Sequence, residues 1–119
     1  MASPVRTLFG GPNGFAMKRL PSLPAERALK ILSGRWKLPL LFYVMQEPRR
    51  LSELQRLVPG ITQKVLIQQL RDMERHGLIR RQAFAGTTRV DYLTTDLAEA
   101  LRPLLPQLCA WGQLTEGPQ

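Results

Sequence analysis

Apolar residues follow a helical spacing most clearly between residues 51 and 77. Leucines at three-residue intervals predict a short helix over 51–57. Pro59 and Gly60 end that helix, because proline lacks an amide hydrogen and glycine tolerates a positive φ. A second, longer helix follows and ends at Gly77. The stretch therefore predicts a helix-turn-helix.

The second helix of this pair has two chemically different faces. Thr62 is placed to cap its first turn through the side-chain oxygen. At about 100° per residue, the apolar residues fall on one face and the basic and amide residues on the other. Such a helix suits packing on a core while entering the DNA major groove, although a solvated helix of a small bundle has the same pattern. The apolar face holds Leu66, Leu70 and Met73, and the polar face holds Lys64, Gln68, Arg71 and Arg75.

Two helices are expected before this pair. Residues 23–33 predict a short helix with Pro24 near its first position and Glu26 in its first turn, both favourable places. A second helix is expected over 35–45, with Pro39 acceptable only in its first turn. It is apolar nearly all round, which predicts the core helix.

A β-hairpin is expected after Gly77, with strands over 78–84 and 89–93 and a four-residue tip over 85–88. A hairpin directly after a recognition helix is the layout of a winged helix. The fold class predicted is therefore mainly α with a small β-hairpin, a winged helix-turn-helix. Arginines along the wing suit phosphate contact or a narrow minor groove, although they also fit ordinary exposed strand positions. These wing residues are Arg80, Arg81 and Arg89.

The chain ends in a strongly apolar helix that Thr95 caps. Pro103 and Pro106 must kink this helix or restart it. The apolar face of this helix is wider than a domain of this size can bury, which favours a subunit interface over a purely internal packing role. Residues 113–119 are expected to fray as a tail. The apolar face contains Leu97, Leu101, Leu104, Leu105, Leu108 and Trp111.

Charge points to a polyanionic partner. The 119 residues carry a net charge of +8. The excess is segregated, with nine cations and three anions over 49–89 but one cation and four anions over 90–119. Arg49 and Arg50, just before the helix-turn-helix, are expected to reach phosphates, a large but sequence-blind term in DNA binding.

Composition excludes several other classes. No apolar run approaches the roughly 18 residues of a membrane helix, and we expect no secretory signal because the first residues contain no long apolar stretch. One cysteine and one histidine cannot form an internal disulfide or a zinc site. His76 has no identifiable catalytic partner, so we expect no enzyme, metal or cofactor, and a cytoplasmic protein.

Residues 1–22 contain three prolines and three glycines without periodicity, which predicts a flexible N-terminal arm. Three roles stay open for this arm. It is an inert tail, it touches phosphates through basic residues, or it docks on a partner subunit through apolar ones. The basic set is Arg6, Lys18 and Arg19, and the apolar set is Phe9, Phe15 and Met17.

The order of elements and several sequence blocks together resemble the HxlR-type family of bacterial winged-helix transcriptional regulators, within the broader MarR-like set. The similarity spans the domain expected over 23–112. Its blocks are Gly34-Arg35-Trp36, residues 50–54, 59–66 and 70–79, Val90-Asp91-Tyr92 and Trp111-Gly112.

The resemblance implies a homodimer that pairs through its first and last helices and binds an inverted repeat. Members repress or activate a gene, and repression is the favoured sense here. By position, the recognition helix is 62–76 and the wing is 80–93. The expected dimer interface contains Leu29, Leu32, Leu101, Leu104, Leu105, Leu108 and Trp111.

Three departures from the family pattern stand out. Redox-sensing members carry a cysteine where Leu23 stands, and the lone Cys109 is expected to be an inert core or interface residue. Ile67 replaces a small polar residue and either meets a thymine methyl or extends the core edge. Ala98 replaces a common glycine, and the wing tip lacks its usual prolines.

We therefore expect a dimeric, sequence-specific DNA-binding regulator. A winged-helix interaction module that grips protein, or nucleic acid without sequence preference, is the alternative. Thr62 would cap its helix and meet a phosphate. Base or groove contacts are assigned to Gln63, Lys64, Gln68 and Arg71, and backbone or wing contacts to Arg49, Arg50, Arg75, Arg80, Arg81 and Arg89. A small-molecule effector pocket is expected near Trp36, Phe42, Tyr43 and Trp111.

Overall fold

The computed structural model describes residues 23–115 of the chain. The expected arm over 1–22 and the end of the expected tail, 116–119, lie outside the described residues. The chain divides between Ser33 and Gly34 into two units, which are described separately. The described part is mostly helical with one two-stranded antiparallel hairpin, so the predicted fold class is confirmed.

The first unit contributes one described helix, α2 (Pro24–Leu32). Pro24 occupies its first position, where the missing amide hydrogen costs nothing. The carboxylate of Glu26 accepts a hydrogen bond from the backbone N–H of Leu23 at 2.8 Å. The start of this helix is therefore fixed as the sequence predicts.

The second unit is built on α3 (Lys37–Gln46), whose Leu40 and Leu41 side chains are completely buried. Pro39 lies in the first turn of α3, where it removes no helical hydrogen bond. The predicted core helix is confirmed, although its apolar character does not bury it all round. Phe42 remains about half exposed.

The turn between α4 (Leu51–Leu57) and α5 (Gln63–Arg75) forms as its sequence requires. Gly60 adopts φ +84°, a conformation that disfavours residues with a Cβ atom. Gln55 on α4 donates a hydrogen bond to the backbone carbonyl of Ile61, which ties the turn back to α4. The Gly60 conformation and the Gln55 hydrogen bond together fix the direction in which the chain enters α5.

The start and the inner face of α5 match the prediction. The hydroxyl of Thr62 accepts a hydrogen bond from the backbone N–H of Val65 at 3.2 Å, which caps the helix. The predicted apolar stripe is buried against the core. Gly77 ends the helical segment with φ +76°. The buried stripe consists of Leu66, Leu70 and Met73.

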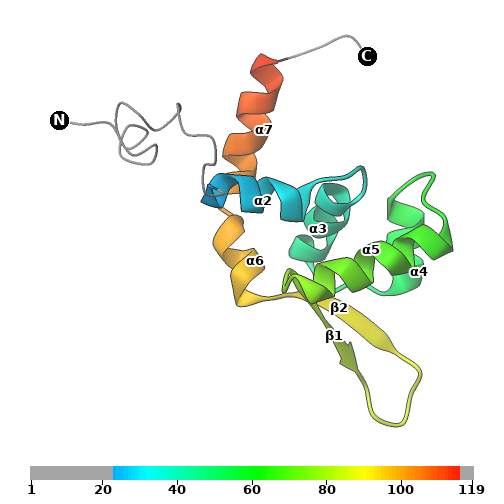
Figure 1. Cartoon of the computed structure of the whole chain (residues 1–119). Coiled ribbons are helices and arrows are strands. Elements are labelled where there is room, and N and C mark those ends of the chain that lie inside the picture. The colour runs from blue at the N-terminus through cyan, green and yellow to red at the C-terminus, as the bar shows by residue number, and fades with distance from the viewer. Residues whose placement is uncertain (1–22, 116–119) are drawn as a thin grey trace, which may run out of the picture. The chain divides into compact units, whose positions relative to one another are not determined.

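The wing consists of β1 (Ile79–Ala83) and β2 (Val90–Thr94), paired from Ile79 with Thr94 to Ala83 with Val90. A third short stretch joins this sheet. Arg49 and Tyr92 exchange two backbone hydrogen bonds of 3.0 and 2.8 Å, so the residue before α4 is tied to the wing. Figure 1 shows the hairpin projecting beyond α4 and α5.

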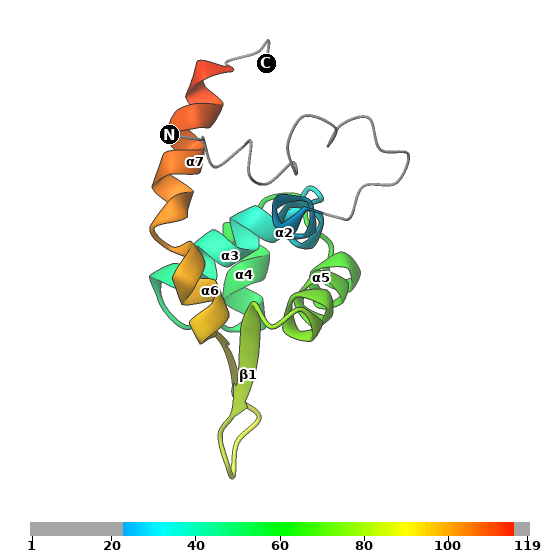
Figure 2. The ribbon, with the colours of Figure 1, turned by 60° about the vertical axis from the view of Figure 1, so that its left-hand side comes forward.

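The last apolar segment restarts at its first proline instead of bending. The helix α6 (Asp96–Leu101) ends before Pro103, and α7 (Leu104–Leu114) begins directly after it (Figure 2). The hydroxyl of Thr95 caps α6 by accepting from the backbone N–H of Ala98, as predicted. The helix α7 runs two residues into the expected tail. No helix within 23–115 is long and apolar enough to cross a bilayer.

A cluster around Arg102 attaches this segment to the end of α3. Arg102 donates to both carboxylate oxygens of Glu99, at 2.7 and 2.8 Å, and to the backbone carbonyl of Met45 at 2.9 Å. Thr94 donates a further hydrogen bond to Glu99. These hydrogen bonds, first from Arg102 and then from Thr94, lower the pKa of Glu99 to about 2.

This lowered pKa predicts an acid-dependent contribution to stability. A carboxylate with a depressed folded-state pKa stabilises the fold above its unfolded-state pKa, and the benefit disappears as pH falls through the folded-state value. We expect Glu99→Gln to melt below wild type at pH 6, and the gap to close between about pH 4.5 and 2. Melting curves at several pH values test this, and a gap that does not depend on pH would contradict it.

Candidate nucleic-acid interface

The outer face of α5 is basic and solvent-exposed. Opposite the buried stripe, this face presents three cations and an amide, which could meet base edges or phosphates in a groove. Thr62 and Gln63 are exposed at the N-terminal end of α5. Ile67 is half-buried, so it lies at the border between the core and this face. The exposed side chains are Lys64, Gln68, Arg71 and Arg75.

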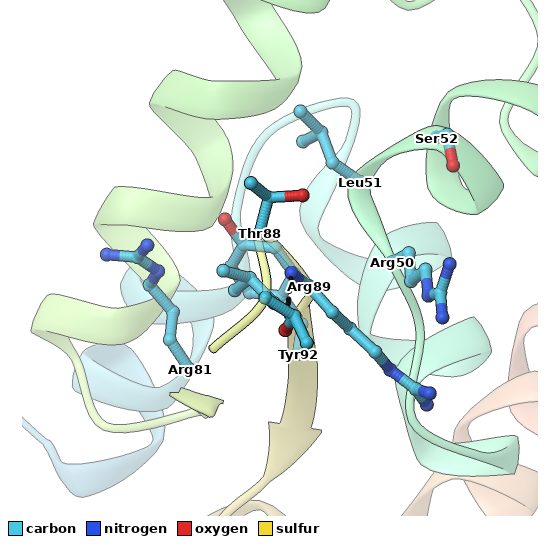
Figure 3. Close-up of a pocket in the computed structure, with 9 residues that line it drawn as sticks. Arg50, Leu51, Ser52, Arg81, Thr88, Arg89 and Tyr92 are labelled. Carbon is cyan, nitrogen blue, oxygen red and sulfur yellow. Dashed lines mark hydrogen bonds between the residues drawn. The ribbon is translucent and has the colours of Figure 1, made fainter. Parts of the chain in front are cut away.

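A hollow of about 700 Å³ lies beside this helix pair, between the start of α4 and the wing. Arg50 and Ser52 line it from α4, and Arg81 and Arg89 line it from the wing. In Figure 3 the side chains of Arg50 and Arg89 extend to one side of the hollow, and Arg81 lies on the other side. Three cations around one concave surface suit a phosphate backbone.

Arg89 is held rigidly at the base of the wing tip. Its guanidinium donates to both carboxylate oxygens of Asp91, at 3.1 and 3.2 Å, and stacks 4.8 Å from the centre of the Phe84 ring. Asp91 is buried. Its hydrogen bonds, together with its charge, raise the pKa of Arg89 above the usual value. Arg89 is thus a preorganised cation, which costs less entropy to immobilise on a ligand.

The tip beyond Arg89 is also ordered by short-range hydrogen bonds. The hydroxyl of Thr87 donates to the carbonyl of Phe84 at 2.8 Å and accepts from the backbone N–H of Arg89 at 3.1 Å. Arg80 and Arg81 are both exposed on β1. Since successive strand residues point to opposite faces, only Arg81 of the two faces the hollow.

Arg49 does not lie where the sequence predicts. It is buried, and its guanidinium donates to the Tyr43 carbonyl at 2.9 Å and to the Gln46 side chain at 2.7 Å. Its terminal nitrogen lies 3.5 Å from the carboxylate of Glu47. These partners turn Arg49 toward the end of α3, so its placement among the phosphate-facing cations is corrected. It supports the junction of α3, α4 and the wing.

The adjacent arginines therefore predict opposite mutational effects. Arg50→Met is expected to weaken binding to all DNA sequences and to reduce the salt slope by about 1, without changing the melting temperature. Arg49→Met is expected to lower stability by on the order of 2 kcal/mol, because the Tyr43 carbonyl and the Gln46 side chain lose a buried, charged donor. Salt-titrated DNA binding and thermal melting on both variants test this, and equal effects would contradict it.

The four aromatic residues expected to share an effector pocket do not line one hollow in the described part of the chain, although the rings of Phe42 and Tyr43 meet edge to face with centroids 5.7 Å apart. Trp36 and Tyr43 line a hollow of about 280 Å³ beside the turn that follows α4. Phe42 lines a different, apolar hollow of about 350 Å³ between α3 and α7. Trp111 lines neither and is largely exposed. Phe42 lines the hollow toward α7, whereas Trp36 and Tyr43 line the hollow toward the turn after α4, so the effector pocket stays a prediction.

Within residues 23–115, α7 has no buried residue, so its expected dimer residues are exposed or half-buried. Cys109 is exposed and borders the hollow between α3 and α7, so its placement in the core of this chain is wrong. On α2, Leu29 is exposed and Leu32 is half-buried. Among the residues of α6 and α7, Leu104, Leu108 and Trp111 are exposed, and Leu101 and Leu105 are half-buried.

A family model described as the HxlR-like helix-turn-helix matches residues 31–119. The chain belongs to the HxlR-like helix-turn-helix family. It is 44% identical over 88 residues to the HTH-type transcriptional regulator YkvN of Bacillus subtilis, which covers 73% of this chain and 75% of YkvN. The predicted membership is confirmed, and this HxlR-like protein is a DNA-binding transcriptional regulator by family.

Solved structures agree with this assignment. The redox regulator HypR in its reduced form matches with a TM-score of 0.70 and 32% identity, over 76% of this chain and 90% of that one. The reduced form of the transcriptional regulator YodB from B. subtilis matches with a TM-score of 0.69 and 28% identity, over 76% and 91%. The helix-turn-helix and wing described above are thus those of an HxlR-like regulator.

Sequence reasoning missed two residues that shape this interface. Asp91 fixes Arg89, and the spacing of two along a strand, which places both side chains on one face, was an available signal. Lys37 forms an ion pair with Asp72 of α5, and no local sequence pattern links residues so far apart.

Proposed function

We propose that this HxlR-like protein is a cytoplasmic repressor that binds an inverted-repeat operator as a homodimer. The observation that carries the proposal is the outer face of α5, which presents basic and amide side chains while its inner face is buried. Base or groove contacts are assigned to Gln63, Lys64, Gln68 and Arg71.

The phosphate backbone is assigned to the residues around the hollow and along the wing. Arg50, Arg81 and Arg89 surround the concave surface, and Thr62, Arg75 and Arg80 lie exposed beside it or on α5. Phosphate contacts fix position but carry no sequence information. Arg49 is left out of this set because it is buried and its donors are occupied, whereas the side chain of Arg89 remains 47% exposed beside Asp91.

The dimer is assigned to the apolar residues of α2 and of α6–α7, within a domain that spans 23–112. Leu104 is 52% exposed and Trp111 is 63% exposed, although both are large apolar side chains on a helix without a buried residue. Contiguous apolar surface of this kind is typical of subunit interfaces. A two-fold dimer would present two copies of α5 to the two halves of an inverted repeat.

Selection of genomic DNA fragments by the purified protein, followed by footprinting and a salt series, tests the proposal. We expect one protected inverted repeat with half-sites about one helical turn apart. Transcription from the selected promoter should fall when the protein is added, which tests repression. Equal binding to all fragments, with only a steep salt slope, would instead support an interaction module without sequence preference.

A further inference from the structure

An ion pair joins the start of the core helix to the second half of the recognition helix. The ammonium group of Lys37, at the start of α3, contacts a carboxylate oxygen of Asp72 on α5. The two side chains are only 11% and 27% exposed. The pair is thus shielded from solvent, where an ion pair is screened less by salt than on an open surface.

The position of Asp72 around α5 gives this pair a specific geometric effect. At about 100° per residue, Asp72 lies on the flank of the helix, between the buried stripe and the exposed basic stripe. Its other charged neighbours, Arg75 at 3.7 Å and His76 at 3.6 Å, belong to α5 or directly follow it. Of the ion pairs that Asp72 forms within residues 23–115, the one with Lys37 is the pair that connects α5 to the core helix.

The hydrogen bond from Lys37 is the main cause that lowers the pKa of Asp72 below its ordinary value, with added contributions from the charges of Lys37, His76 and Arg75. The carboxylate thus remains charged throughout the neutral range. The pair persists under the conditions in which the protein would bind DNA.

We propose that Lys37 and Asp72 are a positioning pair that fixes the roll of α5 about its own axis and thereby gives the protein its preference for one DNA sequence. This inference rests on the proposed function. Contacts of the buried stripe with the core are non-directional and tolerate a small rotation. A charged hydrogen bond at the flank is directional and does not.

The size of the effect follows from helix dimensions. A helix with side chains has a radius of roughly 5–6 Å, so a roll of about 10° moves its outer groups by about 1 Å. That displacement spoils bidentate contacts to base edges, which need good hydrogen-bond geometry. Long arginine side chains adjust to phosphates over the same distance. Loss of the pair therefore lowers sequence preference more than general affinity.

Simple electrostatics predicts the opposite result for one informative variant. Asp72→Asn removes an anion from a basic surface, so charge alone would strengthen binding to every sequence. Glu74→Gln is the matched control, because it removes the same charge from the same helix. The carboxylate of Glu74 forms no ion pair within residues 23–115. The two variants therefore differ in the ion pairs of Asp72, of which the pair with Lys37 joins α5 to α3 and the pairs with Arg75 and His76 stay at α5.

The experiment measures the affinity of wild type and both variants for the selected operator and for a scrambled duplex of equal length. We expect Glu74→Gln to leave the ratio of the two affinities unchanged. Asp72→Asn should lower this ratio about tenfold, comparable with the loss of one base-reading pair, while its affinity for the scrambled duplex matches that of Glu74→Gln. An unchanged ratio in Asp72→Asn would overturn the inference.

Further variants separate positioning from loss of folding. Lys37→Arg keeps the cation and should retain the preference, whereas Lys37→Met should lose it. The double variant Lys37→Met/Asp72→Asn leaves no unpaired buried charge, so it stays folded if a single variant does not. The double variant should lose as much preference for the operator as either single variant alone, since the two residues act as a unit. Additive losses would contradict the pair, and a wild type without preference would instead refute the proposed function.

Discussion

Alanine at Lys64 and at Arg71 is expected to lower affinity for the selected operator by about tenfold to a hundredfold each, which corresponds to about 1–3 kcal/mol. Both side chains project from the exposed face of α5, and neither has a partner that would hold it away from DNA among the described residues. Titration of a labelled operator duplex at fixed salt measures the loss.

The matched control is Lys30→Ala, the same substitution at an exposed lysine of α2. It removes the same charge outside the helix-turn-helix. We expect Lys30→Ala to leave the preference for operator over scrambled DNA unchanged, whereas Lys64→Ala should reduce it. If Lys64→Ala and Arg71→Ala bind the operator as wild type does, α5 does not read bases.

Leu70→Ala is expected to cost about 2–5 kcal/mol of unfolding free energy, because it leaves a cavity beneath the recognition helix. Leu70 is 1% exposed and lies between Leu66 and Met73, which are completely buried. The free energy of unfolding of a folded domain is only about 5–15 kcal/mol, so this loss is a large fraction of the total. The melting temperature should fall by roughly 10 °C or more.

Leu114→Ala is the control for this substitution. Leu114 is 82% exposed at the end of α7, so the same truncation removes no buried contact. Its stability should stay within about 0.5 kcal/mol of wild type. Chemical denaturation with a common slope for all three proteins tests both expectations. Similar losses in the two variants would mean that Leu70 is not part of the core.

The helix-turn-helix could be predicted because its determinants are local. Pro59 and Gly60 end a helix in any context. Thr62 caps the helix that follows, and its hydrogen-bond donor, the N–H of Val65, lies only three residues further along the chain. The two stripes of α5 follow from the helical period alone. Local chemistry of this kind also predicted an interruption at Pro103, although it left open whether the helix would kink or restart there.

The features that could not be predicted depend on how the helices pack against one another, even where the residues involved are close in the sequence. Nothing near Arg49 indicates that Tyr43 and Gln46 will occupy its donors, because exposure depends on how α3 ends beside α4. Lys37 and Asp72 meet only after α3 and α5 have packed. The interface is therefore predictable as a set of exposed cations, but its supporting contacts appear only in three dimensions.

The two hydrogen bonds between Arg49 and Tyr92 use main-chain atoms only. Every residue type except proline supplies the same N–H and carbonyl groups, so this connection does not depend on side-chain identity. The wing and the start of α4 can thus accumulate substitutions while the joint between them is kept. A lineage of such regulators could acquire new operators by changing the side chains around that joint, without having to evolve a new fold.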